Sequence, residues 1–388
     1  MKALNLLFTY FVFLGFIYIM YIAFFEPRVL DSPFGYKTPS IFYDYKGVTH
    51  IHSERSSGSG SIEKIAEAAN NAQLDFIYIT DLNPFEFQNL NEEGIYGRLL
   101  LFSAGEYSYL DAKVLNYHNS TFEHLQSSGR IQLGFSDLLD SPDRSEKFGL
   151  FILSHPFKPG YRWNGDIPVG FDGIEIINLK SLWQQWFEKS KASFIFTLAL
   201  YPFNSRLALI RLLERPRKNL KLWDSLNSKD RYSIGMVGND AEALAKLFNN
   251  YAIELPSYEN MFGMATNHVL LKSELTGDFQ SDKKKIQTAL SLGQFYLSFD
   301  FIANPRGFSA FVQTDGRKEL AMGKDLDLAA PSELVIQLPE KLIAPVKVTL
   351  IKDGEVFMSS DSVVTKVNLT VPGTYRIEVQ VRVPLPFP

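Results

Sequence analysis

Short apolar runs rich in β-branched and aromatic residues recur through the middle of the chain, with helical stretches between several of them. Such runs are typical of strands that are buried on both faces. They occupy residues 75–80, 99–103, 150–154, 173–177 and 233–237, and helices are expected around 62–69, over 182–213 and over 240–248. This alternation predicts a parallel α/β barrel or sheet, in which functional residues collect where the strands end.

Beyond about residue 305 the pattern changes to short strands separated by turn signals. Strands are expected at 335–338, 346–351, 366–371 and 375–381. Asp353-Gly354, between two apolar runs, predicts a hairpin, and Pro372-Gly373 predicts a turn into the last strand. The sequence therefore predicts an α/β barrel or sheet over 45–304 followed by a small all-β sandwich over 305–388.

The N-terminal segment carries no charged residue from position 3 to position 25. About 20 apolar residues span a bilayer, so this run is long enough. It exceeds the core of a signal peptide and lacks a small-residue cleavage pattern, which predicts an uncleaved transmembrane anchor at 1–28 and a linker at 29–44. Lys2 precedes the run and mixed charges follow it, so the positive-inside bias favours a body on the exported side, periplasmic or extracellular.

A second apolar run, at 192–204, is too short to span a bilayer and is expected to form a buried or interfacial helix. It lies inside a long helical insertion between residues 178 and 231. We interpret this insertion as a candidate lid or membrane-facing patch.

Composition narrows the chemistry. The 388 residues carry a net charge of −4 with both signs dispersed, so no basic stripe for nucleic acid is present. The absence of cysteine excludes disulfides, thiolate zinc sites and cysteine nucleophiles. Any metal must be held by His, Asp and Glu, which favours a catalytic or hard-metal site.

Thr49-His50-Ile51-His52 places two of the six histidines two residues apart at the end of an extended run. Side chains at that spacing on a strand share a face, and two imidazoles held together begin a transition-metal site. The later predicted strands end in further ligand-type residues, namely Asp81, Glu106, His118, His155 and Asp240. A metal site at the open end of a barrel requires this placement.

Simpler roles remain open for some of these residues. His118 could be a surface loop residue, Asp240 the N-cap of a helix, and Glu106 an ion-pair partner. His124 and His268 lie outside the series and are expected to be structural.

The ordered motifs resemble those of the PHP (polymerase and histidinol phosphatase) superfamily. The matching segments are Thr49-His50-Ile51-His52, Thr80-Asp81, Gly105-Glu106, His118, Ser154-His155-Pro156 and Gly238-Asn239-Asp240. With the appended β-domain, the chain looks most like the CehA/McbA-type metallohydrolase branch. The resemblance implies a distorted (β/α)7 barrel.

The resemblance also implies a set of ligands. One metal position would use His50, His52, Glu106 and Asp240, and a second would share Glu106 and add His118 and His155. Ser57, Leu82 and Glu242 depart from the family's third metal site. We therefore expect two divalent ions (Mn, Fe or Zn), with a weak third left open and Glu242 as a substitute ligand or base.

The expected activity is attack of a metal-bridged hydroxide on a phosphoester, ester or carbamate of a small molecule. Asp81, Asp240 or Glu242 would manage the proton. Lys158 and Arg162 are candidates for binding an anionic substrate, although loop cations commonly face water. The rival hypothesis is a catalytically degenerate PHP-barrel binding protein tethered to the membrane.

Overall fold

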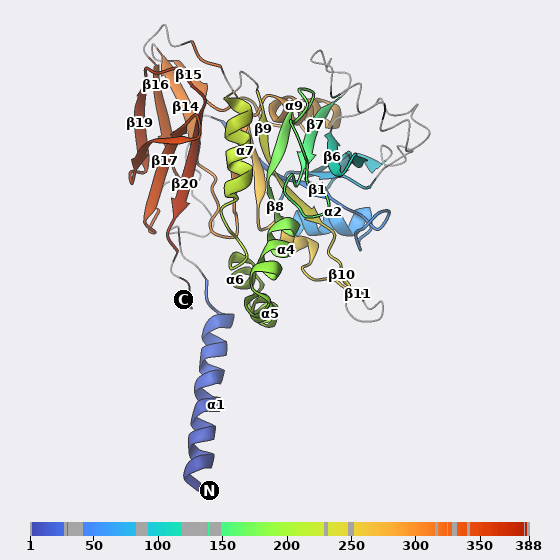
Figure 1. Ribbon diagram of the computed structural model, residues 1–388, viewed down its shortest axis with the longest axis vertical. Coiled ribbons are helices and arrows are strands. Elements are labelled where there is room, and N and C mark those ends of the chain that lie inside the picture. Colours follow the sequence, from blue (N-terminus) through green and yellow to red (C-terminus); the bar gives the residue numbers. More distant parts are fainter. Residues whose placement is uncertain are drawn as a thin grey trace.

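The computed structural model describes residues 2–26, 29, 42–82, 92–117, 133, 139, 149–228, 232–246, 252–314, 317–323, 325–327, 332–339, 342–383 and 385. His118, Arg28 and His124 lie outside these residues. The described chain forms an N-terminal helix, an α/β body and an all-β C-terminal part that lies beside the body (Figure 1).

The body is built on one large mixed sheet whose strands follow the order β3-β4-β2-β1-β9-β8-β7-β6-β5, with β12 and β13 alongside β1. Their bounds are β1 Tyr43–Ile51, β2 Phe76–Ile79, β3 Gly94–Tyr96, β4 Leu99–Ser103, β5 Gly105–Tyr109, β6 Ala112–Tyr117, β7 Leu150–Ser154, β8 Gly173–Asn178, β9 Ile234–Ala241, β12 Thr266–Leu271 and β13 Phe295–Ser298. The run from β4 through β2, β1, β9 and β8 to β7 is parallel, so these strands end at the same edge.

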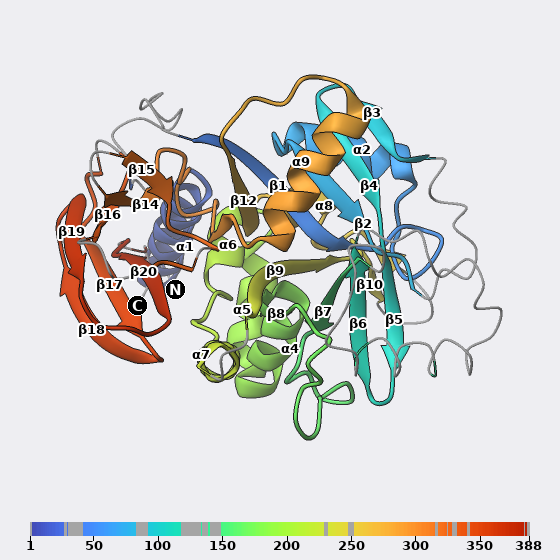
Figure 2. The same cartoon turned by 90° about the horizontal axis from the view of Figure 1, so that it is seen from above.

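The sheet curls back on itself into a half-barrel (Figure 2). Leu82, just past β2, forms an isolated parallel bridge with Glu106 on β5, which brings two distant parts of the strand order together. The α/β prediction is confirmed. Because β3, β5, β6, β12 and β13 pair antiparallel, the described strands do not establish a (β/α)7 count, which stays a prediction.

Helix α2 (Ile62–Asn71) forms as its sequence predicts. The side chain of Ser61 accepts a hydrogen bond from the backbone N–H of Lys64, which satisfies one of the free donors of the first turn. The apolar residues at helical spacing, Ile62, Ile65, Ala66 and Ala69, are buried against the sheet. Helices α8 (Tyr258–Phe262) and α9 (Phe279–Ser291) also cover the body.

The helical insertion consists of α4 (Leu179–Lys189), α5 (Lys191–Leu200), α6 (Ser205–Ile210) and α7 (Arg217–Asn227). The helix predicted over 182–213 is therefore divided into three. Ser190 and Asn204 stand at the divisions, and each side chain accepts a hydrogen bond from the first turn of the next helix. Capping residues inside an otherwise helical pattern explain why one helix becomes several.

The helix predicted over 240–248 is wrong for its described residues, and with it the role of Asp240 as a helix N-cap. Strand β9 continues through Ala241, and β10 (Ala245–Lys246) pairs with β11 (Ala252–Ile253). Ala241 pairs with Ile51 of β1 and its carbonyl accepts a hydrogen bond from the N–H of His52. Pairing within the sheet thus overrides the helical propensity of an alanine-rich stretch.

The C-terminal part is a β-sandwich. One sheet contains β15 (Arg317–Leu320), β14 (Ser309–Thr314), β16 (Ser332–Gln337) and β19 (Val364–Leu369), and the other contains β18 (Glu355–Ser360), β17 (Val346–Lys352) and β20 (Tyr375–Val381). Apolar side chains from both sheets form one core. The hairpin predicted at Asp353-Gly354 joins β17 to β18, with positive φ at both residues, as a tight hairpin turn requires. The boundary between 304 and 305 falls between β13 and β14, and its meaning for independent folding stays a prediction.

Helix α1 (Lys2–Ala23) is long and apolar enough to cross a bilayer, the one such helix among the described residues, and a signal sequence would pass the same test. Its C-terminal end is seated on the body (Figure 1). Ile22 is buried against Leu200, Leu207 and Ala208. The side-chain amide of Asn204 donates to the carbonyls of Ile22 and Phe25, at 2.9 Å each. These bonds tie the chain at the end of α1 to the body of the protein.

Strand β1 has two neighbours on one side. Its first half, Tyr43 to Gly47, pairs with β12, and its second half pairs with β9. On the β12 side, buried His268 has Nδ1 2.7 Å from Asp44 and Nε2 3.2 Å from Asp300, and the ring of Tyr296 stacks on it with the centroids 4.7 Å apart. These contacts give His268 the structural role expected for it.

Candidate metal centre

Five residues that the sequence placed at strand ends converge at one edge of the sheet. His50 lies in β1 and His52 directly follows it, Glu106 lies in β5, His155 follows β7, and Asp240 lies in β9. All five are buried, with at most 3 % of each residue exposed. Burying this many ionisable groups together is costly unless they neutralise one another or hold a cation.

Glu106 and Asp240 stand between the imidazoles. Nε2 of His50 lies 3.5 Å from Glu106 Oε1 and 3.8 Å from Asp240 Oδ1, and Nε2 of His52 lies 3.6 Å from Glu106 Oε2 and 3.6 Å from Asp240 Oδ1. Nε2 of His155 lies 3.5 Å from Glu106 Oε1. Glu106 therefore faces all three histidines, as a bridging ligand would.

These distances fit a bound metal ion better than they fit direct hydrogen bonds. Metal–ligand bonds of about 2.1 Å meeting at about 110–130° hold two ligand atoms roughly 3.4–3.8 Å apart. The ligand atoms of His50, His52 and Asp240 all lie within 4.8 Å of one another. Nε2 of His50 is buried without a hydrogen-bond partner although it points at two carboxylates. A buried nitrogen without a hydrogen-bond partner can instead donate its lone pair to a metal ion.

Glu175 on β8 holds His50 and His155 in position from the side away from Glu106 and Asp240. Its Oε1 lies 2.6 Å from Nδ1 of His50, and its Oε2 accepts from the hydroxyl of Ser154 and the N–H of His155, both at 2.9 Å. A carboxylate on one imidazole nitrogen leaves the other directed at the metal. Gly238 on β9 permits this packing, because a Cβ there would meet the carboxylate of Glu175.

Three of the convergent residues have left-handed backbone conformations. The φ angles are 63° at His50, 29° at His155 and 48° at Asp240. Such angles are uncommon for residues other than glycine and store strain that the surrounding fold must hold. At His50 the register of β1 shifts against both β2 and β9. Simple strand alternation therefore predicts the right pair of histidines but omits the bulge that aims them.

The electrostatics of the cluster are those of a cation site. Burial would lower the pKa of His50, but Glu175, Asp240 and Glu106 outweigh it and raise this pKa well above its usual value. Burial alone would raise the pKa of the Glu106 and Asp240 carboxyl groups. His50 and the neighbouring cationic groups outweigh burial and hold both pKa values well below their usual range. The carboxylates are thus kept ionised and the imidazoles lie in a strongly negative environment.

Asp81, expected to manage a proton, is engaged elsewhere. Its carboxylate accepts hydrogen bonds from the backbone N–H of Ser53 at 2.7 Å, the hydroxyl of Ser53 at 2.6 Å and the hydroxyl of Ser56 at 2.5 Å. The Ser56 hydroxyl lies 3.4 Å from Nδ1 of His52. Asp81 therefore fixes the loop after β1.

The candidate substrate-binding cations are separated by the fold. Lys158 is buried, with Nζ 3.4 Å from Oδ2 of Asp240, whereas Arg162 is exposed. The expectation that loop cations face water is therefore wrong for Lys158. Glu242 forms an ion pair with Lys180 at 2.6 Å, and the same ammonium lies 3.7 Å from Asp240. Among the three departures, Leu82 makes the backbone bridge to Glu106 and Ser57 has a buried hydroxyl without a partner.

Sequence reasoning did not assign two residues of this region, Glu175 and Lys180. Glu175 had a signal, since it is a lone charge inside the apolar run Gly173-Ile174-Glu175-Ile176-Ile177. Burial raises the pKa of Glu175, but His50 outweighs it and lowers this pKa. Lys180, in the first turn of α4, has no such signal. Burial alone would lower the pKa of Lys180, but the carboxylates of Asp240 and Glu242 outweigh burial and raise this pKa above its usual value. The ammonium group therefore stays charged.

Comparison with known proteins gives limited help. No known family profile matches the chain, and no curated protein matches it. Among solved structures, a two-domain protein from Bacteroides vulgatus ATCC 8482, described as containing a predicted PHP-like metal-dependent phosphoesterase, aligns with 92 % of this chain and 89 % of its own. The identity is 14 % and the TM-score 0.38, values at which the likeness supports no argument about this chain.

Proposed function

We propose that this chain is a membrane-anchored, divalent-metal-dependent phosphoester hydrolase. The observation that carries the proposal is the unpaired Nε2 of buried His50, which faces Glu106 and Asp240 at the separations of metal ligands. His50, His52, Glu106 and Asp240 would hold one ion. His155 and His118, with Glu106 shared, would hold a second, although His118 lies outside the described residues.

When bound, such ions supply a nucleophilic hydroxide at neutral pH and stabilise charge on the attacked centre. The protein's own groups define what can approach. Lys158 and Lys180 place two ammonium groups beside Asp240, and such groups bind the charged oxygens of a phosphate better than the oxygens of a neutral ester or carbamate. Glu175 orients His50 and His155, while Asp81 and Ser56 hold the loop next to His52.

Proton transfer would fall to the carboxylates at the opening of the site. Glu242 is only partly buried and is ion-paired with Lys180, so we assign its carboxylate the role of accepting a proton at the edge of the site. We prefer this role to metal binding, because the ligand atoms that lie together are those of His50, His52 and Asp240.

Retention of the N-terminal helix is part of the proposal. The end of α1 is buried in the body and hydrogen-bonded by Asn204, a fit that a removed signal sequence would not need. The charge bias around the helix favours a body on the exported side of the membrane.

The test combines metal content with activity of the full chain in nanodiscs. We expect one to two divalent ions per chain and hydrolysis of p-nitrophenyl phosphate esters in preference to the carboxyl ester. Glu106→Gln should lose both metal and activity, and Glu355→Gln, the same change at an exposed position in β18, serves as the matched control. Less than one tightly bound ion per chain, unchanged by Glu106→Gln, would instead favour a binding protein on a degenerate barrel.

A further inference from the structure

A cavity of about 540 Å³ adjoins the candidate metal centre. Its volume lies within the range of small-molecule sites. Asp240, a candidate metal ligand, forms part of its wall, together with Lys180 and Glu242. The cavity therefore begins at the residues that would carry out hydrolysis.

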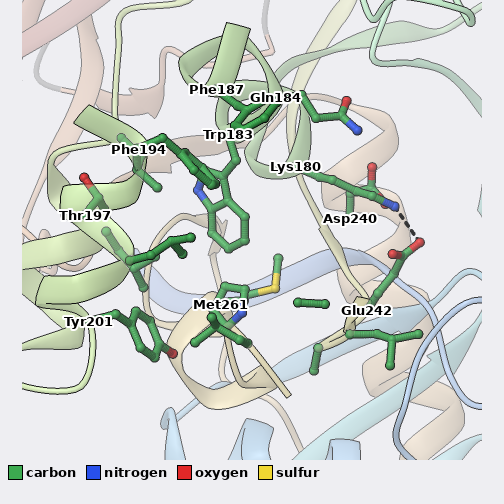
Figure 3. A pocket seen from close by; sticks show the side chains of 18 of the residues that line it. Lys180, Trp183, Gln184, Phe187, Phe194, Thr197, Tyr201, Asp240, Glu242 and Met261 are labelled. Atoms are coloured by element: carbon green, nitrogen blue, oxygen red, sulfur yellow. Dashed lines mark ion pairs between the residues drawn. The ribbon is translucent and has the colours of Figure 1, made fainter. Parts of the chain in front are cut away.

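Away from this polar end the walls are apolar. Figure 3 shows Lys180, Asp240 and Glu242 on one side, and Trp183, Phe194 and Tyr201 on the other. The apolar side is formed largely by α4, α5 and α6, with Phe187, Leu198, Leu209, Leu212 and Met261 among the lining residues. A phosphoester without a hydrocarbon portion would leave this part of the cavity without a complementary ligand surface.

The cavity reaches the surface on the same helices. Phe187 and Leu198 line it and are 45 % and 40 % exposed. Beside them on α5, Ile195 and Phe196 are 62 % and 46 % exposed. Exposed apolar side chains gathered on one element mark a contact with a protein, a ligand or a membrane.

Helix α1 indicates which contact this is. The end of α1 packs on Leu200 at the end of α5 and on Leu207 of α6. Figure 1 shows α5 and α6 at the end of the body from which α1 extends. If α1 spans a bilayer, the surface of that bilayer lies against α5. Basic side chains flank the apolar ones, with Lys191 5.6 Å from the ring centre of Phe187 and Arg211 5.1 Å from that of Phe196, as in helices that lie at a lipid surface.

From these observations we infer that the substrate is a membrane lipid carrying a phosphoester. Its hydrocarbon chain enters the cavity between α4 and α5 from the bilayer, and its phosphate lies beside Lys180 at the metal centre. This inference rests on the proposed function, which it deepens by naming the substrate class. It also assigns the helical insertion a role as a lipid-facing entrance.

The first test measures binding without catalysis. Ethyl and octyl phosphonate, which are not hydrolysed, are titrated against the full metal-loaded chain in phosphatidylcholine nanodiscs by calorimetry. A buried methylene contributes up to roughly fourfold in affinity, so six additional methylenes should give at least a tenfold preference for the octyl compound.

Two variants of α5 separate the cavity from the bilayer. Leu198→Glu places a carboxylate in the cavity wall and should reduce the octyl preference at least tenfold. Ile195→Glu makes the same kind of change at a more exposed position that does not line the cavity, and it should retain the preference. Because all samples contain the same lipid, partitioning of the octyl chain into the disc is common to them.

The second test asks whether the chain comes from the bilayer. A phospholipid with brominated acyl chains, incorporated in the same disc, should quench the fluorescence of Trp183, and Leu198→Glu should remove this quenching. Trp183→Phe identifies the part of the signal that belongs to Trp183. Quenching that Leu198→Glu leaves unchanged would overturn entry from the membrane.

The outcomes distinguish the lipid-substrate inference from the proposed hydrolase activity on which it rests. Equal binding of the two phosphonates, with hydrolysis of p-nitrophenyl phosphate esters still dependent on Glu106, would overturn the lipid substrate and leave the hydrolase standing. Chain-length-dependent binding that Leu198→Glu abolishes, without hydrolysis of any ester, would support a lipid site and refute the hydrolase.

Discussion

His268 gives a quantitative prediction about how the body is held together. Its buried imidazole lies between Asp44 and Asp300, and although burial lowers its pKa, the two carboxylates outweigh burial and raise it to about 9. In an unfolded chain the value is about 6.5. At about 1.36 kcal/mol per pH unit, protonated His268 then stabilises the fold by roughly 3 kcal/mol.

The sign follows from the direction of the pKa change. A group with a higher pKa in the folded protein stabilises it when protonated, so the contribution is complete below about pH 6.5 and disappears as the pH rises through about 9. Burial raises the pKa of Asp300, but His268 outweighs it and lowers this pKa, so the pair loses its stabilising effect in acid as well. The informative comparison is therefore between pH 6 and pH 9.5.

The assay is thermal unfolding of the full chain in nanodiscs at both pH values. His268→Gln should lower Tm at pH 6 by roughly 4–6 °C and have a much smaller effect at pH 9.5. Tyr296→Phe is the matched control, because it removes the phenol that donates to Asp44 at 2.6 Å and keeps the imidazole. If the parent chain and His268→Gln show the same change in Tm between the two pH values, the assigned ion pairs do not stabilise the fold.

Three further predictions concern the metal centre. Glu175→Gln should weaken metal binding about 10- to 100-fold, because it removes the carboxylate that faces Nδ1 of His50. Calorimetric titration with Mn²⁺ or Zn²⁺ measures this affinity, and an unchanged value would contradict the orienting role of Glu175. Gly238→Ala should weaken binding in the same titration, because the added Cβ meets the Glu175 carboxylate. Gly94→Ala, at a glycine of β3 with open space around it, should leave binding unchanged. Metal ion at about 100 times its Kd should stabilise the fold by about 2.7 kcal/mol. The stabilisation should appear as a higher Tm that a chelator reverses and that the Glu106→Gln variant does not show. An equal rise of Tm in Glu106→Gln would mean that the ion binds elsewhere.

Much of the architecture follows from local patterns. The buried strands, the capped helix after Ser61 and the hairpin at Asp353-Gly354 are each specified by a few neighbouring residues, and each forms as predicted. The convergence of ligand residues also follows, because parallel strands end at one edge of the sheet. His50 and Asp240 could therefore be placed near each other although 190 positions separate them in the sequence.

The remaining details depend on tertiary contacts that no local pattern contains. Residues around Asp240 have helical propensity, yet they form a strand because β1 supplies a partner. The positive φ at His50 is imposed by the register shift against β2 and β9. Lys180 lies near Asp240 only because α4 begins where β8 ends, next to β9. The position of His118 stays a prediction.

Strand β1 also links the metal centre to the C-terminal sandwich. The strand that contains His50 carries Asp44 near its start, and Asp44 accepts a hydrogen bond from Tyr296. The ring of Tyr296 packs on Phe308 with the centroids 4.8 Å apart. Phe308 belongs to the core of the sandwich. The sandwich is thus not an interchangeable module. Recombining this body with an unrelated C-terminal domain would remove a support from the strand that contains His50 and leads into His52, both candidate metal ligands. Such chimaeras should therefore lose metal affinity before they lose their fold.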